Sequence, residues 1–200
     1  HATTRLCLTA LEKTIRGGER VLDLGCGSGI LSIAALKLGA ASAAAVDIDD
    51  KCRDVAYENA ALNGIGQDTY TVRIGDVLGD AVLRADLGGG WQMVVANIVA
   101  DVIIGLSPLV RPMLAPGGLF LCSGIIDDRA QEVADRLREN GWEILETRSA
   151  EGWFPISAAE QELEKRGSDL KTLGRLDGFL GGHMAPVVIC CVALGIAFPE

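Results

Sequence analysis

Aromatic residues are scarce in this chain of 200 residues, which contains three Trp, two Tyr and four Phe. Basic residues are also in deficit, because 18 Lys and Arg stand against 27 Asp and Glu and leave a net charge of −9. Affinity for nucleic-acid phosphates requires clustered Lys and Arg, and stacking on single-stranded bases requires aromatic rings. The composition therefore argues against direct binding of nucleic acid and favours a basic protein as the partner.

Motifs for metals, disulfides and membranes are missing as well. The six cysteines form no C-x-x-C pair and no spacing typical of a zinc site, so we expect no metal ion. Scattered free thiols are typical of a reducing compartment. The longest apolar run, residues 184–198, is interrupted by a proline and is shorter than the roughly 20 residues of a membrane-spanning helix. Because no signal peptide is recognisable at its start, the chain is predicted to be cytoplasmic and not to associate with a membrane.

Glycine, in contrast, is abundant at 25 residues, and many glycines separate short apolar runs from helical patterns. A regular alternation of strand and helix predicts an α/β fold with a doubly wound, mostly parallel sheet. In such sheets, ligands bind beyond the carboxyl ends of the strands, where the strand order reverses. The predicted strands are residues 20–24, 43–48, 70–74, 91–98, 119–123 and 142–147; the helices are 6–15, 30–38, 51–62, 101–114 and 127–140; and a turn is expected at 116–118.

The first predicted strand runs into a G-x-G-x-G loop formed by Gly25, Gly27 and Gly29. Glycines allow the backbone to approach a ligand closely, because a Cβ atom would fill that space. The dinucleotide pattern G-x-G-x-x-G would require a third glycine at Ile30, which disfavours an NAD-dependent oxidoreductase. Asp23, two residues before the loop, would repel a pyrophosphate and suits a ligand with a positive charge, such as an ammonium or a sulfonium.

Two further carboxylates follow the next two strands. Asp47 lies 22 residues after Gly25, where a carboxylate can accept hydrogen bonds from both hydroxyls of a ribose. Asp76 follows the third strand and is placed to meet the edge of an adenine. These residues could instead form only a structural turn, but the coincidence of strand, loop, helix and acid favours a ligand that contains a nucleoside.

This arrangement resembles the class I S-adenosyl-methionine-dependent methyltransferases, which have a Rossmann-like fold. Over about residues 1–153 the chain is similar to the bacterial ribosomal-protein methyltransferases, which methylate lysine and N-terminal amino groups of a large-subunit ribosomal protein. The resemblance implies S-adenosyl-L-methionine as the cofactor, with Thr4, Gly25, Asp47 and Asn97 as its contacts. It rests on His-Ala-Thr-Thr at 1–4, the glycine loop through position 31, Val-Asp-Ile-Asp at 46–49, Val-Val-Ala-Asn-Ile at 94–98 and Ser-Gly-Ile-Ile at 123–126.

Asn97 is the predicted catalytic residue. Its amide carbonyl, together with neighbouring backbone carbonyls, can accept a hydrogen bond from an amine and aim the lone pair of the nitrogen. The alternative is that Asn97 caps the helix that follows, and Thr4 has the same alternative at the first helix.

We divide the chain into a cofactor-binding methyltransferase domain at residues 1–153 and an atypical C-terminal extension at 154–200. Pro155 interrupts the expected last strand, so either residues 187–194 supply that strand or the extension is non-native sequence. Members of the family carry a small N-terminal substrate-recognition domain before the His-x-Thr-Thr segment, and we expect this chain to lack it. A chain that starts without Met inside a patterned segment is expected to be a piece of a longer protein.

Three functions stay open at this point. The leading one is an N-methyltransferase that acts on a basic ribosomal protein. The second keeps the cofactor but methylates a small molecule or another protein, and the third is a non-catalytic cofactor-binding module. The sequence does not specify an oligomeric state.

Overall fold

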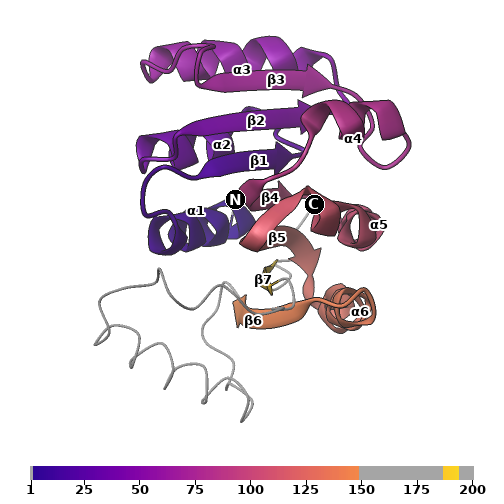
Figure 1. Ribbon diagram of the computed structural model, residues 1–200. Helices are drawn as coiled ribbons and strands as arrows, with labels where there is room; N and C mark the ends of the chain where they lie inside the picture. Colours follow the sequence, from indigo (N-terminus) through magenta and orange to yellow (C-terminus); the bar gives the residue numbers. More distant parts are fainter. Residues whose placement is uncertain (1, 149–186, 194–200) are drawn as a thin grey trace, which may run out of the picture.

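The computed structural model describes residues 2–148 and 187–193 of the chain (Figure 1). In chain order the elements are α1 (Ala2–Thr14), β1 (Arg20–Leu24), α2 (Ile30–Lys37), β2 (Ser42–Asp47), α3 (Lys51–Leu62), β3 (Tyr70–Ile74), α4 (Ala81–Leu87), β4 (Trp91–Asn97), α5 (Ala100–Val110), the 3-10 helix η1 (Arg111–Met113), β5 (Leu114–Ile126), α6 (Asp127–Glu139), β6 (Glu143–Arg148) and β7 (Val187–Ala193).

The strands form one sheet in the order β3-β2-β1-β4-β5-β7-β6, in which every pair of neighbours is parallel. The chain first builds outward from β1 to β3 and then returns to continue from β4 on the other side of β1. The strand order therefore reverses between β1 and β4. The predicted α/β class and doubly wound parallel sheet are confirmed.

Helices cover both faces of the sheet, as the view along its edge shows (Figure 1). Because successive side chains of a strand point to opposite faces, Leu22 joins a buried cluster with α5 and α6, whereas Val21 joins a second cluster with α1, α2 and α3. Strands buried on both faces are apolar throughout, which explains why β4 is an almost continuous apolar run. No helix in the described part of the chain is long and apolar enough to cross a membrane.

Two sequence-based predictions about elements were wrong or incomplete. Helix α4 was missed; its first turn is capped by Asp80, whose carboxylate accepts hydrogen bonds from the N–H groups of Val82 and Leu83 at 2.8 and 3.0 Å. The turn predicted at residues 116–118 lies instead within β5. The strand bulges there, since Leu114 pairs with Trp91 while the next pair along β4 is Met93 with Leu119.

The C-terminal part of the chain contributes β7, which lies between β5 and β6. Residues 149–186 and 194–200 lie outside the described residues. The division into a methyltransferase domain and an extension therefore stays a prediction.

Candidate functional site

A cavity of about 320 Å³ opens at the carboxyl ends of β1, β2, β3 and β4. Its volume lies in the range of roughly 300–1,000 Å³ that is usual for small-molecule sites. Because the strand order reverses between β1 and β4, it also lies where doubly wound sheets bind their ligands. The lining residues are Leu24, Gly25, Val46, Asp47, Ile48, Gly75, Asp76, Val77, Leu78, Ile98, Val102 and Leu106.

The structure brings three of the predicted site residues, Gly25, Asp47 and Asp76, to this cavity. The Asp47 carboxylate is fixed by the backbone, because Oδ2 accepts from the N–H of Gly27 at 2.8 Å and Oδ1 from the N–H of Asp49 at 3.0 Å. Each carboxylate oxygen can accept a second hydrogen bond. Asp47 is thus a preoriented acceptor for a pair of hydroxyl groups.

The walls beside these carboxylates are apolar. Ile48, which follows Asp47, is 73% exposed, and Leu78, two residues after Asp76, is 37% exposed. The Asp76 Oδ1 accepts from the N–H of Leu78 at 2.9 Å, which fixes the acid and the leucine relative to each other. Exposed aliphatic side chains beside an acceptor suit a flat, weakly polar ring that carries an amino group, such as adenine.

Asp23 lies beneath the glycine loop and does not line the cavity. Asp23 is 1% exposed, and its Oδ2 accepts from the N–H and hydroxyl of Ser32 at 3.1 and 2.5 Å. Burial raises the pKa of Asp23 to about 6, although the hydrogen bonds from Ser32 act in the opposite direction. The buried Oδ1 has no hydrogen-bond partner within the described residues. Asp23 therefore connects β1 to the first turn of α2, and an interaction with a cationic group stays a prediction.

The three loop glycines differ in what surrounds them. A Cβ at Gly25 would lie 2.8 Å from Cδ1 of Ile98, on the wall of the cavity. A Cβ at Gly29 would lie 2.7 Å from the Tyr70 hydroxyl and 3.1 Å from the Ala56 Cβ, so this glycine allows β3 and α3 to pack against the loop. Gly27 acts through its N–H on Asp47. Direct ligand contacts of Gly27 and Gly29 stay predictions.

Asn97 and Thr4 lie next to each other although 93 residues separate them. The Asn97 Nδ2 donates to the Thr4 Oγ1 at 3.4 Å, which leaves the Oδ1 as the atom that can accept from an amine. The capping alternatives for both residues are wrong. The N-cap of α5 is Val99, and Thr4 lies inside α1.

Sequence reasoning missed several residues of this region. Ile98 could have been suspected, because it follows Asn97 at the end of a strand. The position of Ser32 in the sequence gives no comparable indication, since its contact with Asp23 depends on how α2 packs on β1. In the part of the chain that the structure describes, no group of three His, Cys, Asp or Glu side chains is arranged to hold a metal ion.

Comparison with known proteins assigns the chain to a family. The family model for ribosomal protein L11 methyltransferase (PrmA) matches residues 1–161. The chain belongs to this family. A ribosomal protein L11 methyltransferase of Desulfitobacterium hafniense is 45% identical over 161 residues, which cover 80% of this chain and 49% of the relative. One from Limosilactobacillus reuteri is 46% identical over 158 residues, covering 79% and 47%. The chain thus spans about half the length of these curated relatives.

Solved structures agree with this assignment. The ribosomal protein L11 methylase of Lactobacillus delbrueckii subsp. bulgaricus matches with a TM-score of 0.64 and 38% identity, covering 70% of this chain and 69% of that one. A methyltransferase of Thiobacillus denitrificans, solved with S-adenosyl-L-homocysteine, has a TM-score of 0.51 at 22% identity over 61% of this chain and 49% of its own, and shares the fold. The resemblance to ribosomal-protein methyltransferases is confirmed.

Proposed function

We propose that this chain is the S-adenosyl-methionine-dependent methyltransferase part of a ribosomal protein L11 methyltransferase, and that it methylates lysine or N-terminal amino groups of that protein. The main support is the Asp47 carboxylate, which two backbone N–H groups fix at the edge of a cavity of suitable size. Membership of the PrmA family adds the substrate class.

The cofactor fits the residues that line the cavity. Asp47 would accept from the two ribose hydroxyls, Ile48 and Leu78 would contact the adenine faces, and Asp76 would accept from the adenine amino group. Thr4 and Asn97 would contact the methionine end. The unpartnered Oδ1 of Asp23 supports a nearby hydrogen-bond donor, either an N–H of the cofactor ammonium or an O–H of a water bound to it. When bound, the cofactor supplies a methyl group that its sulfonium has already activated.

Because the methyl group is already activated, the protein mainly orients the acceptor and helps to remove its proton. A lysine amine has a reference pKa of about 10.4 and must lose a proton to water before its lone pair is free. The apolar side chain of Ile98 beside Asn97 disfavours the charged ammonium form. The Asn97 Oδ1 would accept an N–H of the neutral amine and hold its lone pair toward the methyl group, at roughly 3–3.5 Å.

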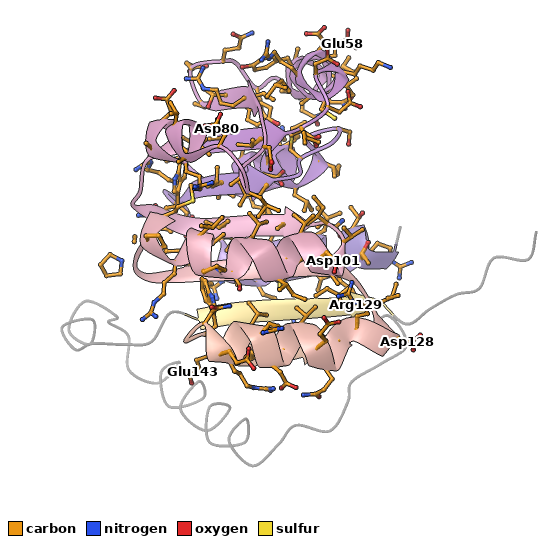
Figure 2. All side chains as sticks on the ribbon, turned by 90° about the vertical axis from the view of Figure 1, so that its right-hand side faces the viewer. Glu58, Asp80, Asp101, Asp128, Arg129 and Glu143 are labelled. Carbon is orange, nitrogen blue, oxygen red and sulfur yellow. The ribbon has the colours of Figure 1, made fainter. Side chains whose placement is uncertain are left out.

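The partner is proposed to be a basic protein, and the chain to act in the cytoplasm without nucleic acid or membrane. The net charge of −9 supports this choice. Acidic side chains lie on several surface elements, and Figure 2 labels Glu58, Asp80, Asp101, Asp128 and Glu143. Of these, Asp80 already caps α4 and Asp101 pairs with Arg129 at 2.7 Å.

The test is to incubate the chain with S-adenosyl-methionine and purified ribosomal protein L11 and to follow the mass of L11. We expect L11 to gain whole methyl groups, and Asn97→Ala to lower the rate about a hundredfold, since misplaced reacting groups cost rates of this order. Asn63→Ala, at the exposed end of α3, is the matched control and should leave the rate unchanged.

The alternatives give different results in the same assay. A chain that binds the cofactor but methylates neither L11 nor any other acceptor is a cofactor-binding module and contradicts the proposal. A chain that methylates small amines or other proteins but not L11 supports the second alternative.

A further inference from the structure

Strand β5 leaves its regular pairing where it passes the end of β4. Asn97 and Ser123 form the last residue pair between these strands, and the pairing of β5 with β7 shifts register between Cys122 and Ile125. Bulges of this kind bend a strand locally and are frequent beside active sites. Gly124 lies in this bulge.

Gly124 allows two backbone segments to come unusually close. Its φ is +87°, a conformation that side chains disfavour, and a Cβ built on it would lie 2.5, 2.8 and 2.9 Å from the O, N and C atoms of Ile98. These atoms belong to backbone and cannot rotate away as the end of a side chain can. Any larger residue at position 124 must therefore displace the backbone of Ile98, the residue that follows Asn97.

Ile98 is also held by two other contacts. The Ile98 N–H donates to the Ser123 carbonyl at 2.9 Å, and the Ile98 side chain lies against Gly25 on the wall of the cavity. Ile98 is thus the link between the glycine loop, β5 and Asn97. We refer to the packing of the Ile98 backbone on Gly124 as the Gly124 clamp.

We infer that Gly124 is a positioning residue, whose missing side chain lets the Ile98 backbone rest on β5 and thereby fixes Asn97 for the acceptor amine. This inference rests on the proposed function of Asn97. Gly124 itself is proposed to contact neither cofactor nor acceptor; it acts through the backbone of Ile98, which is bonded to Asn97.

The test compares Gly124→Ala with Gly64→Ala. Gly64 has a φ of +73° and no atom within 4 Å of a built Cβ, so its substitution has a similar backbone cost without a collision. In 15N-labelled protein, we expect the amide resonances of residues 97–99 to move in Gly124→Ala and to stay in place in Gly64→Ala. The kcat for methylation of L11 should fall by about tenfold to a hundredfold in Gly124→Ala relative to Gly64→Ala. Unmoved resonances, or a kcat within about twofold of the control, would overturn the inference.

A second measurement needs no variant and covers the case in which Gly124→Ala does not fold. In the unaltered chain, the clamped Ile98 N–H should exchange with solvent much more slowly than the N–H of Asp101 in the first turn of α5. Equal exchange rates would contradict the clamp. Amide resonances and exchange rates can be measured in an inactive protein. A failure of the clamp is therefore distinguishable from a failure of the proposed function, because in the latter case neither the unaltered chain nor any variant methylates L11.

Discussion

At the scale of single residues, the buried Asp23 carboxylate lowers the free energy of unfolding at neutral pH. A pKa of about 6, against an ordinary value of 3.8, means that the folded chain keeps this proton between about pH 4 and pH 6 while the unfolded chain loses it. The folded state then binds more protons, so the free energy of unfolding falls as the pH rises through this window. This pKa difference corresponds to about 3 kcal/mol of free energy of unfolding. The folded chain has lost all of this stability once the pH reaches about 7.

Replacing Asp23 by Asn should remove this cost while retaining an oxygen that accepts from Ser32. We expect the stability of Asp23→Asn relative to the unaltered chain to rise by about 3 kcal/mol between pH 4 and pH 7, measured by denaturant unfolding. Asp68→Asn, at the exposed turn before β3, is the control and should show no such change. Parallel pH profiles for Asp23→Asn and the unaltered chain would show that Asp23 is not the group responsible.

We expect cofactor affinity to depend most on Asp47, because two backbone N–H groups fix its carboxylate on the wall of the cavity. In Asp47→Asn, one of the two oxygens becomes an NH2 group that faces a backbone N–H or a ribose hydroxyl, and the negative charge is lost. Hydrogen bonds to charged groups contribute about 1.5–3 kcal/mol, so the Kd for S-adenosyl-L-homocysteine should rise roughly tenfold to a hundredfold. Asp68→Asn again provides the control, and an equal Kd in both variants would exclude the ribose role of Asp47.

At the scale of elements, Ser107 connects α5 to the segment between α6 and β6. Pro108 has no N–H for the Ile104 carbonyl, and the Ser107 hydroxyl donates to that carbonyl instead, at 2.8 Å. The Asn140 Nδ2 donates to the same hydroxyl at 2.7 Å, and the Trp142 Nε1 donates to the Ser107 carbonyl at 2.9 Å. These contacts hold α5, which begins three residues after Asn97, in place on the sheet.

Removal of the Ser107 hydroxyl should therefore leave the Ile104 carbonyl without its donor and take from the Asn140 Nδ2 one of its two acceptors, the other being the Arg136 carbonyl. We expect Ser107→Ala to lower the free energy of unfolding by about 1–3 kcal/mol, because Ser107 is fully buried. Ser42→Ala, at the half-buried start of β2, should change it by less than about 0.5 kcal/mol. A loss no larger than that of the control would mean that water replaces the hydroxyl.

Most elements could be predicted because their signals are local. An apolar run between glycines identifies β1 or β4 without knowledge of its neighbours. Helix α4 was not predicted because it has only seven residues, which are too few to show a periodic pattern. Residues 116–118 have turn chemistry, and only the pairing with β4 shows that β5 accommodates them as a bulge.

The site residues also fall into those that the sequence could predict and those that it could not. Asp47 and Asp76 could be predicted, since the ends of parallel strands meet at one edge of the sheet. The contacts of Asn97 with Thr4 and of Ile98 with Gly124 could not, because each depends on how distant segments pack.

At the scale of the whole molecule, the excess of acids should govern the encounter with a basic substrate. Raising the ionic strength from about 0.1 M to 1 M shortens the Debye length from about 10 Å to 3 Å. The KM for L11 should then rise several-fold, while the Kd for S-adenosyl-L-homocysteine should change by less than about twofold, since short hydrogen bonds would hold the cofactor. A KM that does not depend on salt would contradict an electrostatic contribution to substrate binding.

The central claim is that the cavity at the carboxyl edge of β1 to β4 holds S-adenosyl-methionine. Titration calorimetry of the folded chain with S-adenosyl-L-homocysteine tests it most directly, with Asp47→Asn and Asp68→Asn measured in parallel. The account predicts saturable one-to-one binding that Asp47→Asn weakens and Asp68→Asn does not. A folded chain that releases no binding heat and is not stabilised against thermal unfolding by the ligand would contradict it.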